Sequence, residues 1–306
     1  EIIKSNVAQF ANTQNTIQAA DLVSNHPLHR KIEEHSRNHS VPPGDNQIAT
    51  KWFYERARGQ YETKLRALST PSKKKKFEVE NPKSQKFSKT DMAKYINTWR
   101  MSPFEVKRGA QKNLELLGGT LKKQWDKDPD NFGIAFYKDL IAKAILFKSA
   151  DHAIQYKSGW YKLEPGFKAE TTTYTVSLLR FLLQKDGKDI NLNRIYLNQK
   201  ISESLTNEII SLAKVVRNKI LDLEFRDGAA NPSEFCKSKK GWDKFKELDY
   251  SLKIIEPSDY LTQEQIREVN QKNKTENQIS NDLSFFEQTK QLSMEQWKEV
   301  YNLLLN

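Results

Sequence analysis

The chain has 306 residues, of which 37% are hydrophobic and 29% charged, a balance typical of a folded protein with a substantial core. Lys and Arg outnumber Asp and Glu by 50 to 39, and the resulting net charge of +11 favours an acidic partner such as nucleic acid or a nucleotide. The single cysteine, Cys236, excludes an internal disulfide framework and a cysteine-based zinc cage. Its solitary thiol favours a reducing cytoplasm as the location. No stretch approaches the roughly 18 uninterrupted apolar residues of a membrane span, so we expect no membrane contact.

The first segment shows helical apolar spacing from the start. Residues 2–11 carry this pattern and begin with neither Met nor a signal sequence. We therefore expect the chain to be the C-terminal part of a longer protein. A run of amide and hydroxyl side chains at 12–15, NTQN, predicts a turn. Residues 16–39 then predict two helical segments, separated near Pro27.

The next segment predicts a short strand and a helix start. KWFYER, residues 51–56, is aromatic and short, which predicts a strand that pairs with residues near 77–87. The basic run at 72–76, SKKKK, predicts a solvated loop. Thr90 as N-cap and Asp91 in the first turn predict the start of the following helix.

From residue 105 onward, apolar residues recur at spacings of three and four, which predicts helices. We therefore predict an α+β, predominantly helical fold, with a small mixed α/β N-terminal part followed by a helical C-terminal part. The expected division is 1–104 for the mixed part, 105–256 for the helical domain and 257–306 for an appended polar segment with an amphipathic helix.

The stretch TKWFYERARGQYETK, residues 50–64, interleaves aromatic and cationic side chains. In a strand, Tyr54, Arg56, Arg58 and Gln60 would share one face, because side chains alternate with period two. Two guanidinium groups, a phenol and an amide would then bind phosphate and stack on a base. The alternative is a solvent face on which the arginines pair with neighbouring glutamates.

The polar turn near the beginning is a second candidate. Asn12, Gln14 and Asn15 carry amides that hydrogen-bond a backbone, a phosphate or a base edge, and Asp21 would cap the following helix. A helix-capping turn explains the same residues without a ligand.

Two nuclease patterns are present. Asp91, Glu105 and Lys107 follow the order of metal-dependent restriction-type sites, in which two carboxylates hold Mg²⁺ and a lysine steadies the attacked phosphate. Arg30 and His35 have the spacing of HEPN-type, metal-independent ribonucleases. The first pattern also arises by chance in so charged a chain, and histidines are common near the second, which lies on one helix without its dimer partner. No dedicated metal site stands out.

Four blocks together resemble the abortive infection phage resistance (AIPR) family. They are FANTQNTIQAADLVSNHPLHRKIEEHSR, TKWFYERARGQY, SKTDMAKYINTW and GWDKFK, within a similarity that covers about residues 1–250. The order Phe10, Asn12 and Asp21 is also distantly similar to an element of ParB/sulfiredoxin-like nucleotidases. The arginine and glycine that usually accompany that element are missing.

The resemblance implies bacterial antiphage defence, commonly beside restriction and modification genes. It implies nucleic-acid or nucleotide binding, with any nuclease or nucleotidase catalysis completed by upstream residues; a self-contained nuclease or a helical protein-interaction module is the alternative. The implied partners are nucleic acid, a nucleotide, a second copy of the chain or its upstream part. The implied binding residues, which we expect to lie together, are Asn12, Gln14, Asn15, Asp21, Tyr54, Arg56, Arg58, Gln60, Lys89, Asp91 and Lys94.

Overall fold

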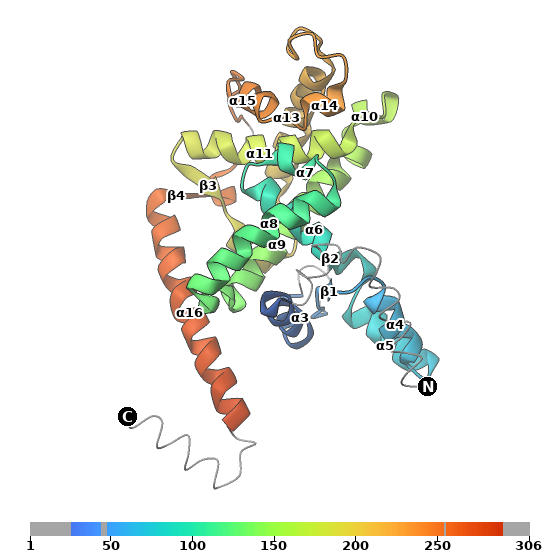
Figure 1. Cartoon of the computed structure of the whole chain (residues 1–306), viewed down its shortest axis with the longest axis vertical. Coiled ribbons are helices and arrows are strands. Elements are labelled where there is room, and N and C mark those ends of the chain that lie inside the picture. The colour runs from blue at the N-terminus through green and yellow to red at the C-terminus, as the bar shows by residue number, and fades with distance from the viewer. Residues whose placement is uncertain (1–25, 44–47, 254, 290–306) are drawn as a thin grey trace.

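The computed structural model describes residues 26–43, 48–253 and 255–289, and this part of the chain is a predominantly helical α+β fold, as predicted (Figure 1). The helices of the N-terminal half are α3 (Pro27–Asn38), α4 (Gln60–Ala67), α5 (Pro71–Glu80), α6 (Lys89–Trp99), α7 (Pro103–Val106), α8 (Ala110–Lys127) and α9 (Ile134–His152). Those that follow are α10 (Trp160–Leu163), α11 (Lys168–Lys185), α12 (Leu192–Asn198), α13 (Glu203–Leu221), α14 (Pro232–Phe235), α15 (Lys239–Lys246) and α16 (Gln263–Thr289). Short helical turns are η2 (Lys83–Gln85), η3 (Pro129–Phe132), η4 (Ala153–Lys157) and η5 (Pro257–Asp259).

Within the described residues, four short strands form two separate pairs. β1 (Phe53–Glu55) and β2 (Lys86–Ser88) are parallel, with Tyr54 opposite Phe87, and β3 (Lys188–Ile190) and β4 (Tyr260–Thr262) are antiparallel. The strand predicted at 51–56 therefore exists, and its partner overlaps the end of the expected region. It is shorter than predicted, because the chain leaves the extended conformation after Glu55.

The basic run at 72–76 is helical and not the predicted loop. Thr70 caps the N-terminus of α5 by accepting a hydrogen bond from the backbone N–H of Lys73, and Pro71 occupies the first turn. Proline at this position has no N–H to leave unpaired, and its fixed φ suits a helix. These two signals outweigh the repulsion among four consecutive lysines.

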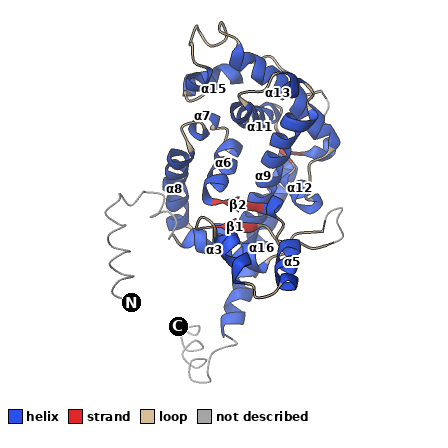
Figure 2. Ribbon diagram, turned by 90° about the vertical axis from the view of Figure 1, so that its right-hand side faces the viewer, coloured by secondary structure: helices blue, strands red, loops and turns tan. Residues whose placement is uncertain are grey.

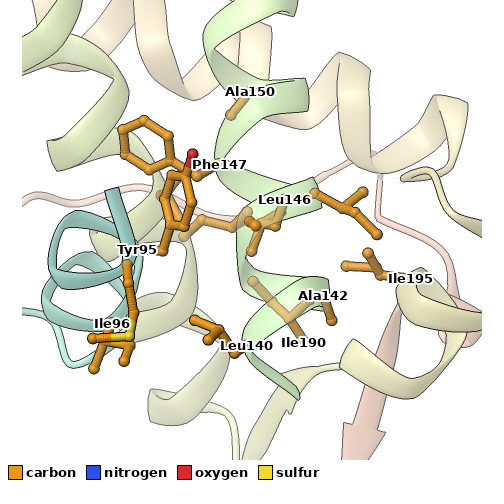
Figure 3. Close-up of a cluster of buried hydrophobic side chains, with 14 of the residues drawn as sticks. Tyr95, Ile96, Leu140, Ala142, Leu146, Phe147, Ala150, Ile190 and Ile195 are labelled. Carbon is orange, nitrogen blue, oxygen red and sulfur yellow. The ribbon is translucent and has the colours of Figure 1, made fainter. Parts of the chain in front are cut away.

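Helix α9 lies at the centre of the fold and contacts α6, α11, α12, α13 and α16. Its sequence, IAFYKDLIAKAILFKSADH, places apolar residues on nearly every side, which is typical of a buried helix. Figure 3 shows Leu146 and Phe147 of α9 among side chains of neighbouring elements, and the ring centroids of Phe147 and Tyr95 are 5.4 Å apart.

One cluster of buried hydrophobic side chains extends from Leu28 to Phe245. It continues across residues 104 and 105, where the sequence analysis places a domain boundary, so the division of the chain into three parts stays a prediction. Over the described ranges, no helix combines the length and the apolar character needed to cross a membrane.

The long helix α16 packs along the body of the protein. It follows β4 and contacts η3 and α9. The side-chain oxygen of Asn277 accepts a hydrogen bond from the backbone N–H of Ala135 at 2.9 Å, in the first turn of α9, and Glu276 pairs with Lys138. Asn277 thus supplies the N-terminal cap of α9 from a residue 142 positions away.

Candidate functional site

Two of the predicted cationic side chains lie at the same edge of the parallel strand pair. Glu55 of β1 is opposite Ser88 of β2, so Arg56 and Lys89 each follow the carboxyl end of a strand. This edge of parallel strands, where helix N-termini begin, is a common place for ligands in α/β sheets. Figure 2 shows the two strands side by side, close to α3 and α6.

Residues 56–59 form a turn and not the predicted strand face. Gly59 has φ 78°, a left-handed conformation that glycine adopts without strain, and α4 begins at Gln60. The Gln60 side-chain oxygen accepts hydrogen bonds from the backbone N–H groups of Arg56 at 3.1 Å and Ala57 at 3.3 Å. The alternation assumed from the sequence ends at Glu55, because the glutamine amide closes this turn.

Glu33 of α3 binds the same turn through its carboxylate. It accepts from Arg56 Nε at 2.8 Å and from Gln60 Nε2 at 2.6 Å, and it also binds Arg37 Nη2 at 2.7 Å. The Arg37 guanidinium lies 4.4 Å from the centroid of the Phe53 ring, and burial lowers the pKa of Arg37 despite the nearby Glu33. Arg56 and Gln60 therefore hold the turn on α3, which leaves exposed Arg58 as the side chain presented to solvent.

Tyr54 is not the predicted stacking ring. It is fully buried, and its hydroxyl lies 2.6 Å from Nδ1 of His29. Its ring packs against Phe87, since residue 54 points to the opposite side of the strand from Phe53 and Glu55. Burial, with the nearby charges of His26, Lys89 and Arg56, lowers the pKa of His29 to about 4, so this imidazole is neutral at physiological pH.

The Asp91 carboxylate is part of the N-terminal cap of α6. Ser88, and not the predicted Thr90, is the N-cap, and Asp91 Oδ2 accepts from the Ser88 backbone N–H at 3.1 Å and hydroxyl at 2.7 Å. Burial alone would raise the pKa of Asp91, but Lys94 and these hydrogen bonds hold it below its usual value. The pair of Asp91 and Lys94 lines an open groove of about 320 Å³ between α6 and α9, whose lining includes Lys148.

Lys89 lies apart from that groove. It is half-buried, and its charge is among those that lower the pKa of His29 of α3. Residues 89 and 91 are two positions apart on a helix, about 200° around its axis. Lys89 thus belongs with the Arg56 turn, and Asp91 and Lys94 belong with α9.

The metal-dependent nuclease set is not assembled. Asp91 is in the first turn of α6, whereas Glu105 lies in α7, beyond the other end of a helix that spans about 12 Å from residue 91 to residue 99. Lys107 instead pairs with Glu170 of α11 at 2.8 Å. Within the described residues no group of three or more His, Cys, Asp or Glu side chains is placed to hold a metal ion.

The metal-independent pair is separated as well. Arg30 is exposed and His35 is buried, because five positions on a helix place two side chains about 140° apart. The His35 ring lies 5.7 Å from that of Tyr137, and burial, with His39 and Lys31, lowers the pKa of His35 to about 4.

Cys236 is not an activated nucleophile, since burial raises the pKa of its thiol to about 12. The amide candidates Asn12, Gln14 and Asn15, and with them Asp21, lie outside the described residues.

Helices α4 and α5 form a hairpin, residues 60–80, that the sequence pattern did not predict and that we call the basic hairpin. Its base is an aromatic cluster in which Phe77 contacts Tyr61 and Phe53, with ring centroids 5.1 and 5.9 Å apart. Apart from Tyr61, its residues are exposed or half-buried. The Thr70 and Pro71 capping signal would have identified α5 from the sequence.

The basic hairpin and its flanks concentrate positive charge. Residues 56–83 contain nine Lys or Arg against three Glu, a formal charge of +6 out of the whole chain's +11. Consecutive helix residues are about 100° apart, so Lys73, Lys74, Lys75 and Lys76 surround α5 with ammonium groups. All four are exposed, and of these only Lys76 forms an ion pair, with Glu80 at 3.9 Å, within the described part of the chain. Chemically, this surface is suited to binding an extended polyanion.

Comparison with known proteins gives one family match. The model of a family described as AIPR protein matches residues 1–223, which include every predicted site residue. No curated protein matches the chain, and no solved structure matches it.

Proposed function

The chain belongs to the AIPR family, and we propose that it serves antiphage defence in the bacterial cytoplasm by binding the phosphate backbone of nucleic acid. Membership of this family implies a role in abortive infection. The binding surface in this proposal is the basic hairpin together with Arg58. Neither predicted catalytic set is assembled within the described residues, so the proposal concerns binding and not cleavage.

The observation that carries the proposal is the exposed, unneutralised charge of α5. Lys73, Lys74 and Lys75 have no acidic partner among the described residues, and Phe77 of the same helix packs against Tyr61 and Phe53. Cations of this kind gain free energy from a polyanion by releasing its condensed counterions. The contribution is independent of base sequence, so we expect binding to the backbone of both DNA and RNA.

Arg58 extends this surface toward the edge of the strand pair. It is exposed, and the Gln60 and Glu33 contacts fix the turn on which it stands. An arginine on a fixed turn binds phosphate through paired N–H groups at a lower entropic cost than a flexible lysine. Arg56 is excluded from the binding set, since Glu33 already holds its guanidinium.

The test measures binding of fluorescein-labelled duplex DNA and duplex RNA by fluorescence anisotropy over a series of KCl concentrations. The test variant carries Lys73→Ala, Lys74→Ala and Lys75→Ala. The slope of log K against log [KCl] for DNA should become shallower by about 0.9 for each phosphate that the variant no longer neutralises. Adding Arg58→Ala should weaken binding further.

A matched control removes the same charge elsewhere. Lys112, Lys122 and Lys123 are exposed residues of α8, and their replacement by alanine also removes three positive charges from one helix. This control should keep the wild-type slope. Equal losses in the two triple variants, or a chain that binds neither duplex in a salt-dependent manner, would contradict the proposal and favour a helical protein-interaction module.

A further inference from the structure

A second surface of the protein combines aromatic rings with cations. It is an open cleft of about 840 Å³ whose walls come from α6, α8, η3, α9 and α16. Its volume lies within the range of about 300–1,000 Å³ that is typical of small-molecule sites. None of its lining residues belongs to the basic hairpin, and Figure 1 shows α16 on the opposite side of the molecule from α4 and α5.

Three cations line this cleft without an acidic partner in the described part of the chain. Arg100 follows the last turn of α6, Lys127 ends α8, and Lys274 comes from α16, and all three are exposed. The fourth, Lys143, pairs with Asp139, and Asp128 caps η3 and accepts a hydrogen bond from Asn131. The neighbouring carboxylates are thus occupied, and Arg100, Lys127 and Lys274 give the cleft an excess of positive charge.

The floor of the cleft is aromatic. Phe132 and Phe136 pack edge to face with ring centroids 4.8 Å apart, and Phe132 also contacts Trp125 at 5.5 Å. Half-buried Trp99 lines the cleft as well and is fixed by Arg180, whose guanidinium lies 4.0 Å from the centroid of the indole. Phe136 is also half-buried, so part of its ring faces the cleft.

The wall that carries Lys274 is held in place by the adjacent turn of α16. Glu276 pairs with Lys138, and Asn277 caps the N-terminus of α9. A Cβ atom on Gly133 would lie 2.6 Å from Oδ1 of Asn277, so a larger residue at this position would displace the Asn277 side chain from its place at the N-terminus of α9. Arg100 and Lys127 come from helices α6 and α8, which are near each other in the sequence, whereas Lys274 comes from the distant α16, and this contact brings it to the cleft.

We propose that this cleft binds a nucleoside phosphate, with the base against the aromatic floor around Phe136 and the phosphate held by Arg100, Lys127 and Lys274. An aromatic surface accepts any base by stacking, and cations at the rim hold the anionic group. A free nucleotide and a nucleotide within a single strand share this chemistry. The site is separate from the basic hairpin and does not depend on it.

The first test uses AMP, which is too small to bridge the cleft and the basic hairpin, in isothermal titration calorimetry. Replacement of Arg100, Lys127 and Lys274 by alanine should weaken AMP binding by about tenfold or more, since the doubly charged phosphate then has no cation to hold it. The α8 control variant, with alanine at Lys112, Lys122 and Lys123, and the α5 triple variant should bind AMP as the wild type does.

The second test separates base from phosphate. Phe136→Leu keeps an apolar side chain but removes the stacking ring, so it should weaken binding of AMP and leave binding of inorganic pyrophosphate unchanged. A variant whose cleft is merely distorted would lose both ligands. Circular dichroism and thermal unfolding check that each variant is folded.

The third test identifies the source of the nucleotide. A fluorescein-labelled single-stranded oligothymidine is titrated in the background of the α5 triple variant with Arg58→Ala added, so that the contribution of the basic hairpin is reduced. If the oligonucleotide binds and the Arg100, Lys127 and Lys274 substitutions abolish this binding, the cleft takes a nucleotide within a single strand. If only AMP binds, the cleft takes a free nucleotide. Absence of both, or wild-type affinity in the cleft variant, overturns the inference whatever the result for the duplexes.

Discussion

Helices α9 and α11 form one pair and helices α4 and α5 form another, but the first pair is largely buried and the second is largely exposed. In α11, the run from Glu170 to Leu179 is buried without interruption, and most of α9 is buried as well. In the basic hairpin, Tyr61 alone is buried. The comparison indicates that conformational stability and positive charge lie in separate regions, so each can be changed without the other.

The largest expected effect is in the core. Leu146→Ala, at a position only 1% exposed, should lower the free energy of unfolding by about 2–5 kcal/mol, because the cavity adds to the lost transfer free energy. Leu163→Ala is the matched control, since Leu163 is 84% exposed. Urea denaturation followed by circular dichroism measures both. Similar losses of stability in the two variants would contradict the assignment of stability to the buried helices.

The Glu33 network holds α3 on the turn that precedes α4, and its loss should have the next largest effect of a substitution. Glu33→Gln keeps the side-chain shape but removes the carboxylate that binds Arg37 and Arg56, at an expected cost of about 1–3 kcal/mol. Glu34→Gln changes an exposed neighbour on the same helix and should be nearly neutral. The measurement is the same denaturation, and a larger loss for Glu34 would contradict the assignment.

Acid should destabilise the fold through two buried histidines. The pKa values of His29 and His35 are about 4 in the folded chain against 6.5 ordinarily, so the unfolded chain binds more protons between these values. The free energy of unfolding should therefore fall as pH falls from 6.5 to 4, by about 1.4 kcal/mol per pH unit for each histidine.

His35→Phe tests this dependence. This substitution should remove the part of the decline that comes from His35, and the part that comes from His29 should remain. Thermal unfolding across this pH range provides the measurement. An identical pH profile for wild type and His35→Phe would show that the buried ring is not responsible.

The cap that α16 supplies to α9 should have a smaller effect. Asn277→Ala leaves the Ala135 N–H without its acceptor and should cost about 1 kcal/mol. Asn270→Ala, at an exposed position on the same helix, serves as the control. Because Asn277 anchors the helix that carries Lys274, the substitution should also weaken AMP binding. Unchanged AMP affinity would show that Asn277 does not hold the Lys274 side of the cleft in place.

The smallest effect on stability belongs to the basic hairpin. Replacing Lys73, Lys74 and Lys75 by alanine should change the free energy of unfolding by less than about 0.5 kcal/mol, since only exposed side chains are removed and alanine favours a helix. The same variant should bind nucleic acid more weakly and with a shallower salt dependence than the wild type. A large loss of stability here would remove the distinction between the two regions.

Local patterns predicted much of the fold and part of the candidate site. The helical spacing of residues 134–156 predicts α9, and the aromatic run at 51–56 predicts β1. Capping residues could be misassigned by two positions, as with Ser88 and Thr90, because several Ser and Thr residues meet the same local requirement. Period-two alternation failed after Glu55, where one glutamine side chain closes a turn that no residue periodicity reports.

The sequence by itself determined the helical class, the excess of positive charge and the family resemblance, since these depend on composition, spacing and short blocks of residues. Only the tertiary structure decided which side chains are accessible. It buried Tyr54 and His35, engaged Arg56 with Glu33, and separated Asp91 from Glu105 by the length of a helix. It also gathered Arg100, Lys127 and Lys274 around one cleft, because packing of helices distant in sequence, and not their spacing along the chain, sets which side chains meet.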